Sequence, residues 1–305
     1  MQENYTYHKP VMLRECMEGL NIDPDGIYVD VTFGGGGHSR AILEKLTTGH
    51  LYSFDQDADA KTESLKISSP NFTFIQANFR FLNKYLKVYG VKKVNGILAD
   101  LGISSHQIDT PERGFSTRFD AQLDMRMNTS AELSAFKIIN EYNVEDLHKI
   151  LGMYGELKNA KTVANAVVNA RNIKKINTVN DLKNALSSYS PRGKEHKFFA
   201  QVFQALRIEV NEELKVLEDF LVQVPEILAP NGRLVVMAYH SLEDRPVKNF
   251  IRSGKFSGDV EKDFFGNEIK PLQSITRKPL EASEEELLLN SRARSAKLRI
   301  AEKLE

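Results

Sequence analysis

The sequence predicts an α/β fold in which a parallel sheet flanked by helices is interrupted by an inserted all-helical domain. In the first third of the chain, short apolar segments rich in β-branched residues alternate with helical segments, an order typical of parallel sheets. The middle third has helical periodicity almost throughout. An apolar segment over residues 233–238 then resumes the strand pattern. Both ends of the chain are therefore expected to build one sheet.

The first predicted strand leads directly into a glycine turn. Residues 27–31 are apolar, Gly34 to Gly37 follow closely, and residues 39–46 have helical spacing. Glycines permit positive φ and leave no Cβ between a ligand and the backbone. The free N–H groups at the start of the next helix attract negative charge or oxygen acceptors. A flexible linker would seldom lie between a strand and a helix without a spacer, so the turn is predicted to bind a cofactor.

Neighbouring residues separate the cofactor classes that use such a turn. A phosphate-binding P-loop ends in Gly-Lys-Ser/Thr, whereas here His38 follows the glycines and no lysine is present. A dinucleotide site needs a further glycine where Ser39 or Arg40 stands, so it is weakly supported. S-adenosylmethionine fits better, because Asp30 ends the first strand. Asp55 ends the next one, where an acid would hold a ribose diol.

Two further strands are predicted over residues 71–75 and 94–100. Phe79 follows the first of them, where its ring could lie against an adenine or could equally pack in the core. Asp100 ends the second. Ligands of parallel α/β sheets bind at the carboxyl ends of the strands. The side chains at these strand ends are therefore expected to surround one site.

The inserted helical domain is predicted over residues 108–197, between segments 1–107 and 198–305 of the α/β domain. Between residues 158 and 197 there are nine Lys or Arg residues but only two acids, Asp181 and Glu195. A basic helical surface suits a phosphate backbone, because each neutralised phosphate releases counterions. A solvated helix face is the alternative.

The α/β pattern returns after a long helix. This helix is predicted over residues 198–224, where apolar residues keep helical spacing up to Pro225. The returning strand spans residues 233–238, and a final edge strand is predicted within residues 291–301. Each of these segments belongs to the second half of the predicted sheet domain.

Polar residues follow the returning strand directly. His240 and Ser241 come first, with Glu243 close behind. A metal site would need further ligands, and no second histidine stands at ligand spacing. No metal is therefore predicted, and His240 and Ser241 are interpreted as neighbours of the cofactor site.

Composition limits the class of protein. The 305 residues have a net charge of zero, with 41 basic and 41 acidic side chains, so bulk charge does not indicate a nucleic-acid partner. The single cysteine, Cys16, excludes an intrachain disulfide and fits a reducing compartment. No apolar stretch approaches the roughly 20 residues needed to span a bilayer. A cytoplasmic protein without a membrane partner is expected.

Several motifs together resemble a known family. They are VTFGGGGHS at 31–39, DLGISSHQ at 100–107, RGFS at 113–116, LDMRM at 123–127, FQALRIEVNEEL at 203–214, HSLEDR at 240–245 and SRARS at 291–295. In this order they closely resemble the bacterial small-subunit ribosomal RNA cytosine-N4 methyltransferase family known as RsmH or MraW. The resemblance extends over nearly the whole chain, from about residue 7 to residue 303.

The resemblance implies a Rossmann-like class I S-adenosylmethionine-dependent methyltransferase domain with an inserted helical domain that recognises the substrate. It implies methylation of the exocyclic amine of one P-site cytosine in 16S rRNA of the small ribosomal subunit. The positions that match the family's cofactor contacts are Gly36, Gly37, His38, Asp55, Phe79, Asp100 and Gln107. Two departures are visible. Gly35 stands where the family often has a basic residue, and Asp100-Leu-Gly-Ile replaces the Asp/Asn-Pro-Pro-aromatic motif of other amine methyltransferases.

Positioning of the cytosine amine against the methyl group is expected to supply most of the rate enhancement of methyl transfer. The lone pair of a cytosine amine is delocalised into the ring, whereas a methyl group on a sulfonium is already activated, so the enzyme must align the two and exclude water. Asp100 is the first candidate to accept a hydrogen bond from the amine, and His240 or Ser241 is the second. Cys16 lies outside every motif, so no cysteine adduct is expected.

Contact with RNA is predicted for five residues of the inserted domain. Phe115 and Arg126 are candidate gates for a base that must leave its surroundings, although packing between the domains is a comparable interpretation. Lys174, Lys175 and Arg192 belong to the basic surface. A nicotinamide-dependent dehydrogenase and a non-catalytic RNA-binding or assembly factor stay open as alternatives, and the protein is expected to be a monomer or a homodimer.

Overall fold

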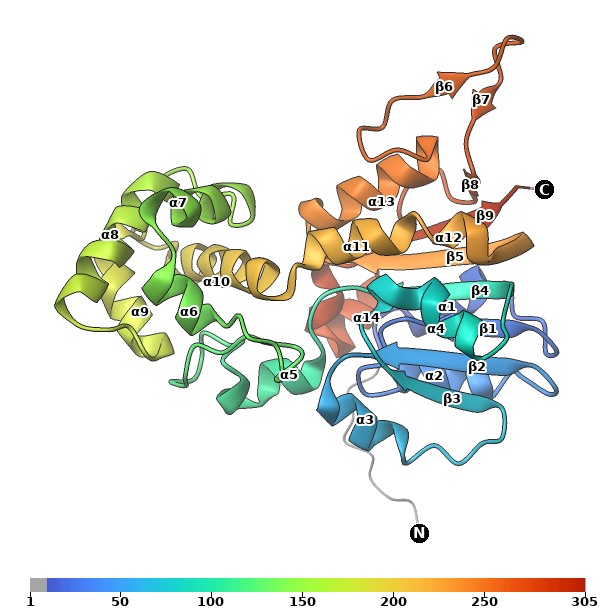
Figure 1. The fold of residues 1–305 in the computed structure, drawn as a ribbon, viewed down its shortest axis with the longest axis horizontal. Helices are drawn as coiled ribbons and strands as arrows, with labels where there is room; N and C mark the ends of the chain where they lie inside the picture. The colour runs from blue at the N-terminus through green and yellow to red at the C-terminus, as the bar shows by residue number, and fades with distance from the viewer. Residues whose placement is uncertain (1–9, 305) are drawn as a thin grey trace. The chain divides into compact units, whose positions relative to one another are not determined.

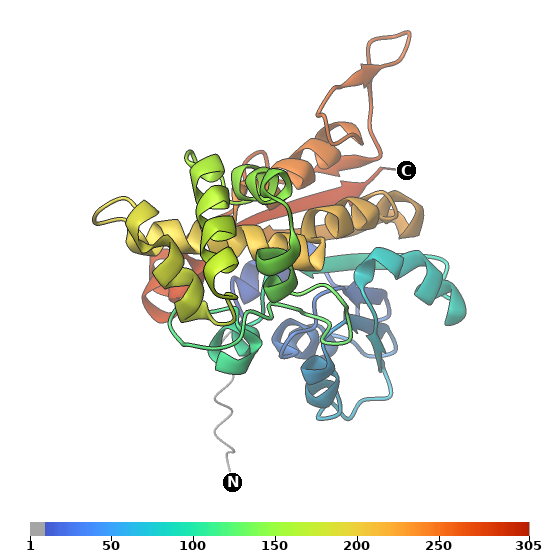
Figure 2. The ribbon, with the colours of Figure 1, turned by 60° about the vertical axis from the view of Figure 1, so that its left-hand side comes forward.

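The structure, a computed structural model, describes residues 10–304 and divides into two compact units. The α/β unit comprises Met1–Gly102 and Leu214–Glu305, and the helical unit comprises Ile103–Glu213 (Figures 1 and 2). The sequence placed the return to the α/β domain at residue 198. The structure assigns residues 198–213 to the helical unit instead, because helix α10 (Glu195–Asn211) packs with the other helices there.

The sheet of the α/β unit has seven strands in the order β3-β2-β1-β4-β5-β9-β8. Their bounds are β1 (Ile27–Asp30), β2 (His50–Asp55), β3 (Phe72–Gln76), β4 (Val94–Asp100), β5 (Leu228–Ala238), β8 (Leu272–Ser274) and β9 (Lys297–Lys303). The first five strands of this order are parallel, and β9 runs antiparallel between β5 and β8. The predicted parallel sheet, built from both ends of the chain, is confirmed. The last strand was predicted at an edge, which is wrong, because β8 pairs with its outer side.

Helices cover both faces of this sheet (Figure 1). They are α1 (Leu13–Leu20), α2 (Gly37–Leu43), α3 (Ala58–Ser64), α4 (Leu82–Val88), α11 (Glu213–Leu221), α12 (Val224–Ile227), α13 (Ser241–Ser253) and α14 (Glu284–Leu289), with short 3-10 helices η1 (Phe79–Phe81) and η4 (Ser291–Ser295). A small hairpin, β6 (Glu261–Lys262) and β7 (Glu268–Ile269), extends from the chain between α13 and β8. No helix within residues 10–304 has both the length and the apolar composition that crossing a membrane requires.

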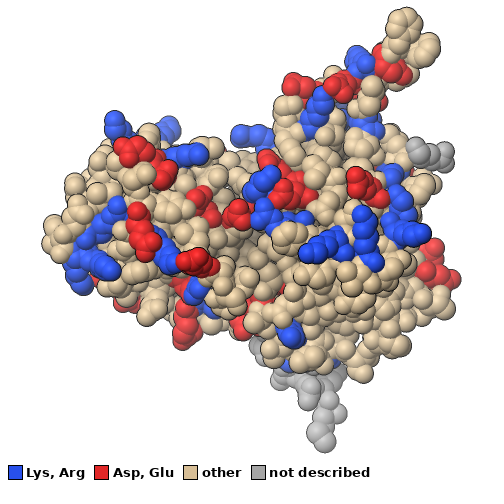
Figure 3. Space-filling model, in the orientation of Figure 1, with Lys and Arg blue, Asp and Glu red and all other residues tan. Residues whose placement is uncertain are grey.

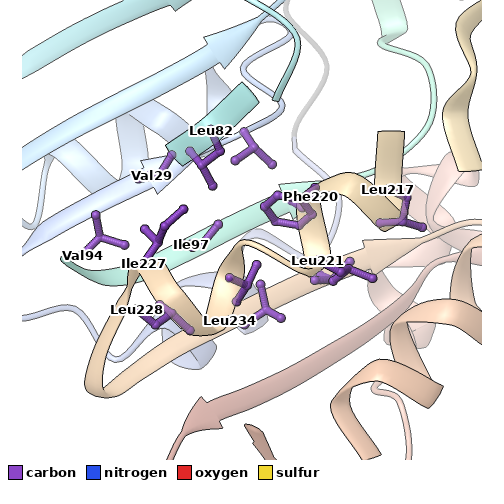
Figure 4. Close-up of a cluster of buried hydrophobic side chains, with 14 of the residues drawn as sticks. Val29, Leu82, Val94, Ile97, Leu217, Phe220, Leu221, Ile227, Leu228 and Leu234 are labelled. Atoms are coloured by element: carbon purple, nitrogen blue, oxygen red, sulfur yellow. The ribbon is translucent and has the colours of Figure 1, made fainter. Parts of the chain in front are cut away.

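Alternating strand residues supply a core on each face of the sheet. One cluster contains Val29, Ile97 and Leu234, against which Phe220 and Leu221 of α11 pack (Figure 4). A neighbouring residue on each of these strands belongs to the cluster on the opposite face: Tyr28, Leu98 and Val235. Burying each large apolar side chain stabilises the fold by roughly 1.5–3 kcal/mol. The strand ends that carry the candidate site are therefore held by two packed layers.

The helical unit has its own core. Its elements are α5 (Ser105–Asp109), η2 (Pro111–Arg113), α6 (Ala135–Glu141), α7 (Val144–Met153), α8 (Ala160–Ile173), α9 (Val179–Leu186), η3 (Ser187–Tyr189) and α10. Fully buried side chains such as Leu147 of α7, Val163 of α8 and Val202 of α10 belong to one hydrophobic cluster. The helical pattern that the sequence indicates is thus the interior of a separate unit.

The single helix predicted over residues 198–224 is wrong: α10 ends at Asn211, α11 spans Glu213–Leu221 and α12 begins only at Val224. Glu212 has φ 49° and ends α10 in the left-handed region, after which α11 and α12 follow. Arg207 and Glu213 lie on either side of this break and form an ion pair with Nε to Oε1 at 2.8 Å. Apolar residues keep helical spacing on both sides of Glu212, so periodicity alone could not reveal the break.

Candidate active site

The turn after β1 can be built only with glycine at its tightest points. Gly36 has φ +75°, and a Cβ there would lie 2.6 Å from Cζ of Phe33. A Cβ on Gly37 would lie 2.3 Å from Cγ of Pro10. Both distances are shorter than any real Cβ contact, because Phe33 and Pro10 already pack against these two glycines. The turn therefore requires glycine at both positions, and its contact with a cofactor stays a prediction.

Asp30 holds the glycine turn through hydrogen bonds to residues on both sides of it. Its side chain is buried, with Oδ2 accepting a hydrogen bond from the Ser39 hydroxyl at 2.6 Å and Oδ1 accepting one from the Thr32 N–H at 3.1 Å. The Ser39 hydroxyl also lies 2.8 Å from that of Ser53 on β2. Burial raises the pKa of Asp30 above its ordinary value. This acid thus joins the end of β1 to the start of α2.

Asp55 lies at the end of β2 and contacts the same turn. Its Oδ2 accepts the Gly34 N–H at 2.8 Å, and its Oδ1 accepts the Asp57 N–H at 2.9 Å. Burial raises the pKa of Asp55 to about 6, although these two hydrogen bonds act in the opposite direction. A carboxylate offers about four lone-pair positions, so two more donors can be accommodated. That capacity suits a pair of vicinal hydroxyl groups.

Phe79 is the first residue of η1, just after β3. Its half-buried ring contacts Phe220 edge to face, with the centroids 5.4 Å apart. Next to it, the side-chain amide of Asn78 donates to Oε1 of Gln56 at 3.1 Å, which ties the segment after β3 to the segment after β2. The ring therefore has a core partner, and its contact with an adenine stays a prediction.

Asp100 ends β4 and is enclosed by three polar neighbours. Its Oδ1 accepts a 2.8 Å hydrogen bond from the Tyr239 hydroxyl, and its backbone N–H donates to Oγ1 of Thr32 at 2.7 Å. Its Oδ2 lies 3.8 Å from Nδ1 of His38. Burial raises the pKa of Asp100 to about 6, while His38 and the Tyr239 hydrogen bond act to lower it. The carboxyl group is thus oriented, and its pKa lies above that of an exposed aspartate.

His38 is fixed by the backbone of the segment before α1. Its Nε2 lies 3.1 Å from the carbonyl oxygen of Val11, and because a carbonyl can only accept, Nε2 must be the protonated nitrogen. The other nitrogen, Nδ1, therefore faces Asp100. His38 is buried, so it lies in the protein interior beside Asp100 and not on the surface of the site.

The residues of the HSLEDR motif, which follows β5, have different partners in the structure. Glu243 is buried in the first turn of α13, where its Oε2 accepts the Tyr239 N–H at 2.9 Å and its Oε1 lies 3.2 Å from Nε2 of His240. Ser241 is the first residue of α13. Asp244 instead accepts two hydrogen bonds from Arg299 of β9, at 2.7 and 2.9 Å, and so holds the helix to the sheet.

Tyr239 is a residue that the sequence analysis missed. It directly follows β5, at the carboxyl end of that strand, and Asp100 lies at the carboxyl end of the neighbouring strand β4. A polar-tipped aromatic residue at the carboxyl end of a parallel strand is the signal that could have revealed it.

Gln107 belongs to the helical unit. Its Oε1 accepts the Ser104 N–H at 3.0 Å, while the Ser104 hydroxyl accepts the Gln107 N–H at 3.2 Å, so the two residues form a capping box at the start of α5. This helix end is thereby fixed. Contact of Gln107 with a cofactor stays a prediction.

Phe115 and Arg126 also have partners within the helical unit. Phe115 is 7% exposed and belongs to the core of that unit, with the guanidinium of Arg113 5.9 Å from its ring centroid. Arg126 donates to both carboxylate oxygens of Asp124, at 2.7 and 2.8 Å. In this arrangement both side chains stabilise the loop before α6, and their contact with RNA stays a prediction.

The three basic residues predicted to contact RNA are exposed. Lys175 and Arg192 lie on the surface, and Lys174 extends from the end of α8 with its Nζ 3.3 Å from Oδ1 of Asp181. Figure 3 shows Lys and Arg side chains on one face of the helical unit, with acidic side chains among them. These cations are accessible to a phosphate backbone.

Comparison with known proteins assigns the family. The model of the MraW methylase family matches residues 5–304, which is nearly the entire chain. The chain belongs to the MraW methylase family. Its sheet order, with the antiparallel β9 between β5 and β8, is that of the Rossmann-like class I S-adenosylmethionine-dependent methyltransferase fold. The fold and the family that the sequence motifs predict are therefore confirmed.

Relatives in this family match over their full length. A protein of Cytophaga hutchinsonii is 60% identical over 297 residues, covering 97% of this chain and 99% of the relative. A protein of Flavobacterium johnsoniae is 52% identical over 305 residues, covering 100% of both. One of Parabacteroides distasonis is 53% identical over 305 residues, covering 99% of both. All three are named ribosomal RNA small subunit methyltransferase H.

Proposed function

We propose that this MraW methylase transfers a methyl group from S-adenosylmethionine to the exocyclic amine N4 of a P-site cytosine in 16S rRNA. The proposed nucleotide is C1402 in standard rRNA numbering, within the small ribosomal subunit. The main support is the relative that is 60% identical over 97% of this chain and is named for small-subunit rRNA methylation. An rRNA substrate also makes the cytoplasm the proposed compartment.

The residues at the carboxyl edge fit the proposed cofactor. Glycine at position 36 lets the backbone take the positive φ that the turn before α2 requires. Asp55 has lone pairs left for the two ribose hydroxyls, and Phe79 is the candidate neighbour of the adenine. When bound, the cofactor supplies an activated methyl group on a sulfonium. Holding that group against the amine is the task of the protein.

Asp100 is proposed to orient the amine. When the carboxylate accepts a hydrogen bond from N4, the nitrogen lone pair is drawn out of conjugation and turned toward the methyl group. After transfer, N4 carries one proton too many, and the same carboxylate can accept it. The raised pKa of Asp100, about 6, makes it a better base than an exposed aspartate while leaving it ionised at neutral pH. His240 and Ser241 are the second candidates for this contact.

The helical unit is proposed to bind the RNA. Exposed Lys174, Lys175 and Arg192 can neutralise phosphates, a contribution that does not depend on sequence. Selection of one cytosine then requires that the base leave its surroundings and enter the site at the strand ends.

The test offers labelled S-adenosylmethionine and unmodified small subunits, naked 16S rRNA or no RNA to the protein, and maps any labelled nucleoside by mass spectrometry. N4-methylcytidine at one P-site position supports the proposal, and comparison of subunit with naked RNA identifies the substrate form. Asp100→Asn should lose most turnover, and a variant that retained both cofactor affinity and turnover would contradict the role proposed for Asp100. Label in another nucleoside contradicts the proposed reaction. Tight binding of a reduced nicotinamide cofactor would favour the dehydrogenase alternative instead.

A further inference from the structure

The hydrogen bond between Tyr239 and Asp100 joins two neighbouring strands at the proposed reaction centre. The Tyr239 hydroxyl donates to Oδ1 of Asp100 at 2.8 Å, and Tyr239 follows β5 directly while Asp100 ends β4. Because Oδ1 already accepts this donor, Oδ2 has more lone-pair positions left for a target amine. This hydrogen bond thus favours one oxygen of the carboxylate as the acceptor.

Tyr239 is itself held by a buried acid. Its backbone N–H donates to Oε2 of Glu243 at 2.9 Å, and Glu243 is 3% exposed in the first turn of α13. The positive end of the helix dipole stabilises a carboxylate at this position. Gly102, with φ +94°, lies beside the ring of Tyr239. A Cβ on Gly102 would be 3.7 Å from Cδ2 of Tyr239, which is an ordinary van der Waals distance. The phenol is therefore fixed through its backbone and through its hydroxyl group.

We propose that Tyr239 is a positioning residue for methyl transfer, which orients the Asp100 carboxylate, and that Glu243 fixes Tyr239 in turn. This inference rests on the proposed function, in which Asp100 accepts a hydrogen bond from the amine. Nothing in the family motif assigns a role to Tyr239, and the residue acts on the reaction only through Asp100.

The charged and titratable groups that face Asp100 come from every element packed around it. They are His38 on α2, Asp30 at the end of β1, Cys16 on α1, Glu243 on α13 and Tyr239 after β5. Among them, the Tyr239 hydrogen bond lowers the pKa of Asp100, whereas the negative charge of Glu243 raises it. Removing the two groups one at a time must therefore move the titration of Asp100 in opposite directions.

The first experiment measures the titration of Asp100 by difference infrared spectroscopy of the free protein, with Asp100→Asn to assign the carboxylic acid band. Tyr239→Phe should raise the pKa of Asp100 by about one unit, since the charged form loses a donor. Glu243→Gln should lower it. General loss of structure cannot produce shifts of opposite sign. Equal titration in Tyr239→Phe and in the unaltered protein would overturn the inference without touching the proposed function.

The second experiment follows the pH dependence of kcat/KM for methyl transfer to small subunits. In Tyr239→Phe the acid limb should move upward by the same amount as the infrared titration, with most activity recovered at high pH. Tyr142→Phe is the matched control, because it removes another 2.8 Å hydrogen bond from a tyrosine hydroxyl to a carboxylate, that of Glu209 in the helical unit. Its acid limb should not move.

The two readouts separate the two claims. A protein that methylates no cytosine contradicts the proposed function, while the infrared titration still decides whether Tyr239 controls Asp100. A shifted titration with an unmoved acid limb shows that the ionisation of Asp100 does not limit turnover, which overturns the positioning role.

Discussion

The N–H of Gly34 donates a 2.8 Å hydrogen bond to Oδ2 of Asp55, which joins the glycine turn after β1 to the end of β2. The two features that indicate a cofactor site in the sequence are therefore one structural unit. A change in the charge of Asp55 is expected to act on the proposed ribose contact and on the turn together.

Binding of S-adenosylmethionine should weaken as the pH falls through about 6. Burial raises the pKa of Asp55 to about 6, and the charged form is the better acceptor for ribose hydroxyls. If only this form binds well, the affinity falls about tenfold between about pH 7.5 and pH 5. Calorimetric titration of the cofactor measures this change. Asp55→Asn should bind weakly and without this pH dependence; a variant that kept the wild-type profile would show that another group titrates.

Gly36→Ala should abolish most cofactor binding. Its φ of +75° strains any side chain by roughly 1 kcal/mol, and the added Cβ would also lie 2.6 Å from Cζ of Phe33. Gly90→Ala is the matched control, because Gly90 has φ +73° and nothing within 4 Å of an added Cβ. Both variants should lose stability from the strained φ, and Gly36→Ala should lose more because of its clash with Phe33; urea unfolding measures both losses. Only Gly36→Ala should lose at least tenfold in cofactor affinity, and equal affinities would contradict the assigned role of the turn.

The site residues at the strand ends were predictable from the sequence, because a parallel sheet places the carboxyl ends of its strands side by side. Asp55 and Asp100 needed only the order of strands and helices to be identified. The contact of Tyr239 with Asp100 was not predictable in this way, since it joins residues 139 apart and depends on the pairing of β4 with β5.

The break between α10 and α11 at Glu212 was not predictable for another reason. A left-handed residue at a helix end leaves no trace in the apolar spacing when a second helix follows immediately.

Asp100→Asn should make the protein more stable at pH 8. The pKa of Asp100 is about 6 in the folded protein and 3.8 in its ordinary state, so between these values the folded protein retains a proton that the unfolded chain has released. The free energy of unfolding therefore falls as the pH rises through this window. An asparagine removes the buried charge and can still accept from Tyr239 while its amide faces Nδ1 of His38. The expected gain is about 1–2 kcal/mol at about pH 8, lost near pH 4.

Urea unfolding followed by circular dichroism checks this prediction, and Asp219→Asn is a control of opposite sign. Burial acts to raise the pKa of Asp219, but hydrogen bonds from Lys215 and Arg80 outweigh it and lower the pKa. Its charge therefore stabilises the fold above its ordinary pKa, and Asp219→Asn should be less stable at pH 8. A loss of stability in Asp100→Asn at that pH would mean that its ionised form contributes more to folding than burial costs.

Replacing Lys175 and Arg192 together with glutamine should weaken binding to the small subunit and flatten its salt dependence. Both side chains are exposed on the helical unit. Each phosphate contact that is lost reduces the slope of log K against log salt by about 0.7–0.9, so the double variant should lose about 1.5. The control replaces Lys87 and Lys92, which are exposed before β4, at the opposite end of that strand from Asp100. Filter binding across a salt series should show an unchanged slope for the control, and equal slopes for both pairs would place the RNA elsewhere. Cofactor affinity should be the same in both double variants, because these four cations lie outside the turn and the strand ends that are proposed to contact the cofactor.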